Sequence, residues 1–169
     1  MENQRKSYND QKLYDEVVID MRRVTKVTKG GRALRFSVSV AVGDRKGKVG
    51  FGTGKANEVP EAISKAIKAA EKNMFTVKLV DNRTISHEVI GQCGAAKVMI
   101  RPAAAGRGIV AGGPIRSILE LAGVKDVVSK SLGSNTKINT SKATINALKQ
   151  QKNLSHIAEL RGKKEEEIR

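Results

Sequence analysis

Two segments rich in β-branched residues meet at a double glycine, and this feature constrains the fold most. The first, residues 16–27, reads EVVIDMRRVTKV and leads into Gly30 and Gly31. The second, residues 34–42, reads LRFSVSVAV and alternates strictly, which is the period of a strand with one buried face. We therefore expect an antiparallel pair whose second strand is half-buried. Its apolar face comprises Leu34, Phe36, Val38, Val40 and Val42, opposite Arg35, Ser37 and Ser39.

The next segments complete a small first domain. Residues 43–54 supply a second glycine-containing turn and a short strand around Val49 and Phe51. Residues 57–73 change to helical spacing, with Pro60 tolerated because it lies in the first turn. The order is β-β-β-α, and one side of the helix carries lysines: Lys65, Lys68 and Lys72.

The second half starts near Met74. We expect strands over residues 74–80 and 84–90 around a turn, a strand over 96–101, and a glycine- and alanine-rich connection without periodicity over 101–113. A helix over 114–123 has Pro114 at its start and Gly123 after its end. A strand within 124–133 and a helix over 139–150, capped by Asn139 or Thr140, follow.

These elements predict an α+β protein with two small α/β domains. The first resembles the β-β-β-α layout of double-stranded RNA-binding folds, and the second is a two-layer α/β sandwich. We expect a flexible arm over residues 1–13, domains over 14–77 and 78–160, and a charged tail over 161–169.

The charge balance indicates a polyanionic partner. The chain has 32 Lys and Arg against 17 Asp and Glu, a net charge of +15, which favours nucleic acid or an acidic membrane surface. A membrane is the weaker interpretation, because no apolar run approaches the roughly 20 residues of a spanning helix. The first residues lack the apolar stretch of a signal peptide, so we expect a cytoplasmic protein.

Other chemistries have little support in the composition. The lone Cys93 cannot form an internal disulfide, and with His87 and His156 it supplies too few ligands for zinc, so we expect no metal and no cofactor. The chain has no Trp, and its few aromatic residues are not grouped for base stacking. We expect no catalysis: His87 fits a strand surface, Cys93 a packed position, and residues 165–167 a solvated acidic run.

Basic residues gather in the first domain. Nine lie between Arg22 and Lys48, against the single acid Asp44, whereas an ordinary solvated surface mixes both signs. Together with cations near the later glycine clusters they form the candidate RNA-binding set. The set is Arg22, Arg23, Lys26, Lys29, Gly30, Gly31, Arg32, Arg35, Arg45, Lys46, Lys48, Lys55, Arg107 and Arg116.

Three glycine clusters could be taken for nucleotide sites. Gly108 and Gly113 have Walker spacing, but Pro114 and Ile115 stand where Lys and Ser or Thr are needed. Residues 106–111 match the loose dinucleotide pattern, with Asp126 where a ribose-binding acid would lie, yet the pattern neither leaves a strand directly nor opens a helix. The segment GFGTGK, residues 50–55, fits a nucleotide-binding pattern less well. The segment AGGPIRS, residues 111–117, either holds a phosphate at a helix N-terminus or merely makes a tight crossover.

Several motifs in register resemble one known family. They are VTKGGRALRFSVSVAVGD, GKVGFGTGKANEVPEAISKA, GRGIVAGGPIRSILELAGVKDVVSKSLGSNT and KATINAL, and they span roughly residues 13–163. They are similar to bacterial small-subunit ribosomal protein five. Two positions depart from the usual pattern, Lys137 where many members have proline and Arg107 where others have a neutral residue; both add a cation.

The resemblance implies more than the residues alone do. It implies a structural, non-enzymatic protein that binds 16S ribosomal RNA where head and body of the small subunit meet, near the path by which messenger RNA enters. It implies contact with the fourth and eighth small-subunit proteins and a role in decoding accuracy with the fourth. In this family the hairpin Lys29–Arg32 reaches ribosomal RNA near the spectinomycin site.

Two alternatives stay open at this point. A small nucleotide-using enzyme built on residues 106–113 would bind nucleotides saturably. A free-standing regulator that binds double-stranded RNA would bind arbitrary duplexes tightly and would not sediment with small subunits. In the isolated protein we expect the first hairpin to be poorly ordered, because its like charges are unscreened and two glycines adjoin.

Overall fold

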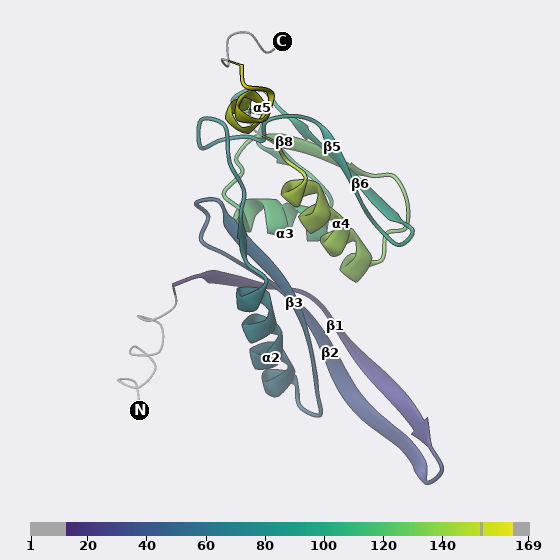
Figure 1. The fold of residues 1–169 in the computed structure, drawn as a ribbon. Helices are drawn as coiled ribbons and strands as arrows, with labels where there is room; N and C mark the ends of the chain where they lie inside the picture. The colour runs from purple at the N-terminus through teal and green to yellow at the C-terminus, as the bar shows by residue number, and fades with distance from the viewer. Residues whose placement is uncertain (1–12, 153, 164–169) are drawn as a thin grey trace.

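The computed structural model describes residues 13–152 and 154–163. The expected arm lies outside these residues except for Leu13, and so do residues 164–169 of the expected tail. The fold is mixed α+β, with an N-terminal antiparallel sheet plus helix and a C-terminal α/β sandwich, as the sequence predicts (Figure 1).

The first sheet has the order β1-β2-β3-β4 and is antiparallel throughout. Its strands are β1 (Asp15–Thr28), β2 (Gly31–Gly43), β3 (Lys48–Ala56) and the short β4 (Phe75–Thr76). Helix α2 (Val59–Lys72) follows β3 and covers one face, where Val38, Val40 and Val42 meet the alanines of the helix. The β-β-β-α order is confirmed.

Alternate glycines of β3 allow α2 to lie very close to the sheet. Gly50, Gly52 and Gly54 all face the helix, opposite Ala70, Ala66 and Ala62. A Cβ on Gly52 would lie 2.3 Å from both the Ala66 carbonyl oxygen and the Ala70 nitrogen, which no real Cβ contact allows. The glycines of GFGTGK therefore serve helix packing.

The second sheet has the order β5-β6-β8-β7. Its strands are β5 (Val89–Cys93), β6 (Ala96–Pro102), β7 (Ile109–Val110) and β8 (Val127–Ser131), with β7 parallel to β8. Helices α3 (Gly113–Leu121) and α4 (Lys137–Lys149) lie on one face, and α5 (Leu154–Arg161) follows. Gly91 of β5 likewise allows a helix to lie very close to the sheet, because a Cβ there would lie 2.1 Å from the Ala143 carbonyl oxygen of α4.

The two domains share one hydrophobic core. Ala41, Val49 and Phe51, on the face of the first sheet away from α2, pack with Leu121 and Leu148 of the second domain in a single cluster. The elements thus stack in four layers: α2, the first sheet, α3 with α4, and the second sheet (Figure 1). Helices α3 and α4 are covered on both sides.

This stacking corrects the prediction that β2 is half-buried. From Val38 to Gly43 every residue is buried, because the small Ser39 and Ala41 face the second domain. Gly43 makes close approach possible there, since a Cβ would lie 2.3 Å from the Leu121 carbonyl oxygen. In contrast, Leu34 is 50% exposed although it belongs to the predicted apolar face, because no layer covers that end of the strand.

Three expectations for the second half are wrong. Of the strands expected over 74–80 and 84–90, only Phe75–Thr76 and residues from Val89 onward are extended in a sheet, and β4 joins the first domain. The connection over 101–113 contains the short strand β7. Helix α4 begins at Lys137 after the N-cap Thr136. Asn139 and Thr140, which we expected as caps, therefore lie inside the first turns of the helix.

Candidate nucleic-acid interface

The hairpin of β1 and β2 extends well beyond the rest of the sheet. β1 pairs with β2 from Asp15↔Gly43 to Thr28↔Gly31, whereas β3 pairs with β2 only from Phe36 onward. Residues 24–35 are therefore a two-stranded projection without a third strand, and together with Arg22 and Arg23 at its base they are here called the ribbon (Figure 1). Every charged side chain on it is exposed, so the ribbon presents cations to solvent.

Cross-strand register places cations on both faces of the ribbon. Val24 pairs with Arg35 and Lys26 with Ala33, which puts Arg35 and Lys26 on the face that continues toward the second domain. Val27 pairs with Arg32 and Arg23 with Phe36, which puts Arg32 and Arg23 on the face that continues toward α2. Lys29 and Gly30 form the tip. The ribbon could thus lie between two rows of RNA phosphates and contact both rows.

The face toward the second domain extends onto β3. Arg22, Ser37 and Lys55 lie in one row across three strands, which brings Lys55 beside the ribbon cations. Arg22 and Lys55 are far apart in the sequence, and only the register of the strands brings them together. The sequence therefore did not predict that they are neighbours.

On the face of the ribbon that continues toward α2, exposed apolar side chains lie among the cations. Val27 is 75% exposed and Leu34 is 50% exposed. Sequence reasoning assigned Leu34 to the core and gave Val27 no role. The density of cations around these two residues could have predicted their exposure, because a segment with so many charges cannot be buried.

An ion-pair group lies at the base of the ribbon. The Asp20 carboxylate, 8% exposed, lies 2.6 Å from Arg22 Nε and 3.4 Å from Lys137 Nζ of α4. Arg22 lies close enough for an ion pair, although Asp20 Oδ2 accepts no hydrogen bond from described residues, so this contact is Coulombic. Lys137, the departure from the usual family pattern, therefore contacts the first domain.

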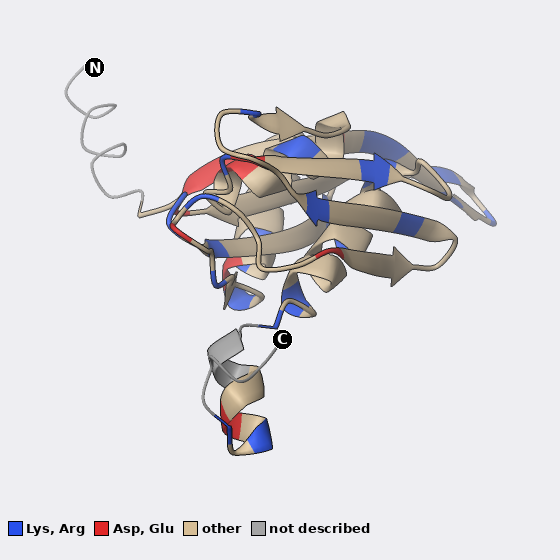
Figure 2. Ribbon diagram, turned by 90° about the horizontal axis from the view of Figure 1, so that it is seen from above, with Lys and Arg blue, Asp and Glu red and all other residues tan. Residues whose placement is uncertain are grey.

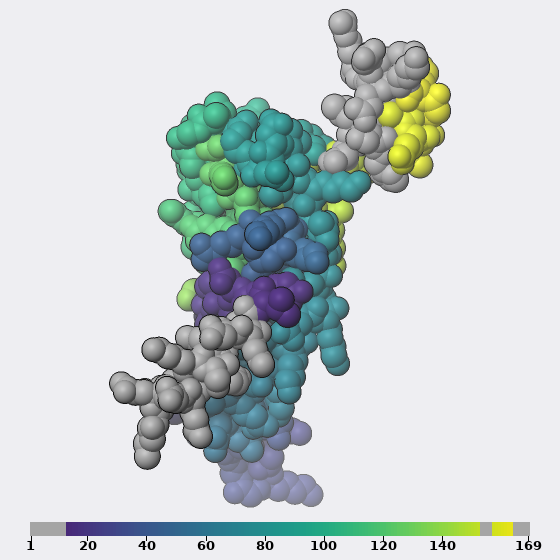
Figure 3. All heavy atoms as spheres, turned by 90° about the vertical axis from the view of Figure 1, so that its left-hand side faces the viewer, coloured from purple at the N-terminus to yellow at the C-terminus, as the bar shows by residue number. Residues whose placement is uncertain are grey.

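The second basic turn does not join the ribbon. Arg45, Lys46 and Lys48 lie at the opposite end of β2, so the nine cations between Arg22 and Lys48 form two patches. The turn lies against the second domain: Arg45 N donates to the Leu121 carbonyl oxygen at 3.0 Å, and Arg45 Nε lies 2.6 Å from the Asp15 carboxylate. Figure 3 shows the segment that contains this turn, in blue, between the purple start of β1 and the second domain.

Arg107 and Arg116 lie on the second domain, apart from both patches. Arg116 Nε donates to Glu120 one turn along α3 at 2.8 Å, and Arg107 is exposed in the loop before β7. Figure 2 shows basic residues on many elements of both domains as well as along the ribbon. The structure thus distributes the fourteen candidates over the ribbon with the adjacent Lys55 of β3, the 44–48 turn and the second domain.

The acid that resembled a ribose ligand has an internal role. Asp126 is buried and accepts hydrogen bonds from Gly108 N at 2.8 Å and from Arg83 at 3.1 Å. Gly106 and Gly108 have φ of +82° and +74°, which turns the loop toward this carboxylate. Both Asp126 oxygens are thus engaged within the protein, and the dinucleotide interpretation has no acid to offer.

These contacts make Asp126 acid-sensitive. The Gly108 N–H and the Arg83 guanidinium lower the pKa of Asp126 against the opposing effect of burial. A carboxyl with a lowered folded-state pKa stabilises the fold fully above its unfolded pKa of about 3.9, and this contribution is lost as pH falls through the folded value. We expect Asp126→Asn to be less stable at neutral pH and to lose less stability than wild type below about pH 4, measured by urea unfolding. Parallel acid profiles for the two proteins would contradict this.

The ribbon should open more readily than the sheet it extends. Its amides have one neighbouring strand, whereas those of Val38–Gly43 lie in a central strand buried on both faces. In the isolated protein we expect amide exchange at Lys26 and Leu34 to be at least about 100-fold faster than at Val40, or about 2.7 kcal/mol in opening free energy. Native-state hydrogen exchange by NMR measures this, and equal rates would refute it.

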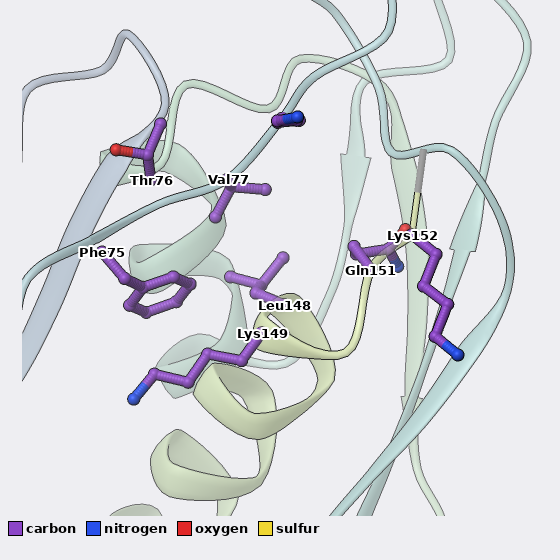
Figure 4. Close-up of a pocket in the computed structure, with 8 residues that line it drawn as sticks. Phe75, Thr76, Val77, Leu148, Lys149, Gln151 and Lys152 are labelled. Atoms are coloured by element: carbon purple, nitrogen blue, oxygen red, sulfur yellow. The ribbon is translucent and has the colours of Figure 1, made fainter. Parts of the chain in front are cut away.

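A hollow of about 410 Å³ lies between the domains, away from the ribbon. Phe75 of the first domain and Leu148 of α4 line it, and Lys149 Nζ lies 5.1 Å from the Phe75 ring centre (Figure 4). His87 near this hollow is not on a strand as predicted: its ring bonds the Glu88 carbonyl oxygen at 2.9 Å and accepts from Lys152 N at 3.1 Å. His87 thus anchors the segment after α4.

The fold and the surface define a class first. Two α+β domains with a shared core, a net charge of +15 and a basic two-stranded projection are the features of an RNA-binding protein. No helix among the described residues is long and apolar enough to cross a membrane.

Comparison with known families then identifies the family. Residues 14–78 match the family described as ribosomal protein S5, N-terminal domain, and residues 91–161 match ribosomal protein S5, C-terminal domain. The chain belongs to the ribosomal protein S5 family. It is a ribosomal protein of the small subunit, a structural component of the translation machinery and not an enzyme.

Proposed function

We propose that the ribbon binds 16S ribosomal RNA by contacting its backbone phosphates. The observation that carries this proposal is the register of the hairpin, which places cations on both faces of a projection that no other layer covers. Such a surface suits phosphate and shape recognition, because the described residues of the ribbon include no stacking aromatic side chain.

The candidate residues contribute in three groups. The main group is the ribbon with Lys55, where Gly30 and Gly31 allow the tip to approach the RNA closely: Arg22, Arg23, Lys26, Lys29, Gly30, Gly31, Arg32, Arg35 and Lys55. Arg45, Lys46 and Lys48 make a separate contact at the other end of the sheet. Arg107 and Arg116 make a third from the second domain.

The family supports a finer assignment, which we include in the proposal. The protein is bacterial and cytoplasmic, lies between head and body of the small subunit near the path of messenger RNA, and contacts the fourth and eighth small-subunit proteins. Its contact with the fourth contributes to translational accuracy. We place the domain boundary between residues 77 and 78, since β4 still pairs with β3.

Sedimentation and salt titration test this function together. The tagged chain should sediment with small subunits, and its affinity for small-subunit RNA should fall steeply with salt, because each phosphate contact releases about 0.9 counterion on duplex-like sites. Tight binding to arbitrary duplexes with no sedimentation in the small-subunit fraction would favour a free-standing RNA regulator. A nearly flat salt dependence would contradict phosphate recognition.

A further inference from the structure

A pocket of about 380 Å³ lies at the N-terminus of α3 in the second domain. Residues that line it come from three segments: the turn into the helix, strand β8 and the loop before α4. They include Val110, Gly112, Ile115, Ser129, Ser131 and Asn135. None of the residues lining it is acidic, and the pocket lies outside the ribbon and the 44–48 turn.

Two serine hydroxyls in this pocket lack partners. Ser129, 8% exposed, and Ser131 alternate on β8, on the same side as the core residue Val127. Both Oγ atoms are buried, and among the described residues neither has a hydrogen-bond partner. Buried hydroxyls are nearly always hydrogen-bonded in proteins, so this pair at a pocket is free to bond a group that enters the pocket.

The helix supplies further donors. α3 has Gly112 as its N-cap and no side-chain cap, and its first intrahelical bond runs from Arg116 N to the Gly112 carbonyl oxygen at 2.8 Å. The N–H groups of Gly113 and Ile115 precede that bond, and the positive end of the helix dipole lies there. A Cβ at Gly112 or Gly113 would meet nothing within 4 Å, so the approach to these groups is open.

We propose that this pocket binds a phosphate group. Its donors are two hydroxyls and helix N–H groups, no residue lining it is acidic, and this combination suits an acceptor-rich anion. The phosphate comes either from an RNA backbone, which rests on the proposed function, or from a free phosphate ion. Gly112 and Ser129 are the residues that decide binding.

NMR of the ¹⁵N-labelled full chain tests the proposal. Inorganic phosphate, added at constant ionic strength, should shift the Gly113 and Ile115 amides and saturate. Ser129→Ala should weaken this binding at least about fivefold, since one charge-assisted hydrogen bond is lost. Gly112→Asp should abolish it, because its backbone has the φ of −66° and ψ of 154° of an N-cap, where a carboxylate would take the same donors. Ser37→Ala on the first sheet is the matched control and should change nothing.

Three further arms assign the source and keep the test decisive. A short duplex RNA that shifts the same amides, and fails to do so with Gly112→Asp, identifies the RNA backbone as the source; shifts with inorganic phosphate alone identify the free ion. The Lys29→Glu, Arg32→Glu double variant should lose RNA affinity while keeping the inorganic phosphate shift, which separates this site from the ribbon. No saturable shift, or equal binding of acetate, would overturn the proposal.

Discussion

Replacing Lys29 and Arg32 together by glutamate is expected to lower affinity for small-subunit RNA by about 50-fold or more at 0.1 M salt. If counterion release supplies most of the binding free energy, each phosphate contact contributes a factor of about eight between 1 M and 0.1 M salt, so two lost contacts give this magnitude. The slope of log affinity against log salt should fall by about two. Filter binding or fluorescence anisotropy across a salt series measures both.

The matched control reverses two cations elsewhere. Lys97→Glu with Lys142→Glu makes the same change in net charge on exposed residues of the second domain. We expect it to lower affinity severalfold at most, because only the long-range field changes. Similar losses for both double variants would mean that total charge matters and the ribbon does not.

Gly52→Ala is expected to destabilise the protein by more than about 3 kcal/mol, a large part of the 5–15 kcal/mol of a typical domain. The added Cβ would lie 2.3 Å from the Ala66 carbonyl oxygen and the Ala70 nitrogen, so α2 must move away from the sheet. Val38, Val40 and Val42 would then lose part of their cover. Urea unfolding followed by circular dichroism measures the loss as a lower midpoint.

Two further variants isolate the cause. Gly30→Ala adds the same methyl group where nothing lies within 4 Å, so its stability should change by less than about 1 kcal/mol. Ala66→Gly should not rescue Gly52→Ala, because the opposing atoms belong to the helix backbone. A rescue, or a loss below about 1 kcal/mol for Gly52→Ala alone, would refute the close-packing account.

Local periodicity was enough to predict the order of β1, β2, β3 and α2 in the first domain. The strands joined at Gly30 and Gly31, and α2 with its buried alanines, form where the sequence places them, because each is specified by neighbouring residues. The error over residues 74–90 has a physical cause: Val77 and Ile85 are buried in the shared core without belonging to a strand. The alternating apolar residues there are buried between the two domains, and their alternation does not mean that they belong to paired strands.

The candidate site divides in the same way. Cations of the ribbon could be predicted as neighbours because they are close along the chain. The row of Arg22 and Lys55 depends on register, and the contacts of Asp20 with Lys137 and of Asp126 with Gly108 join distant segments. No single-sequence pattern specifies such pairs.

The core shared by the two domains affects the order in which the chain can mature during synthesis. The first sheet leaves the exit tunnel before the helices that cover its second face exist, so the cover of Ala41, Val49 and Phe51 is complete only after α4 emerges. At about 5–20 residues per second, the roughly 90 residues between β3 and the end of α4 take about 5–20 s. For that interval the nascent chain exposes part of an apolar sheet face, and apolar surface exposed in this way favours aggregation.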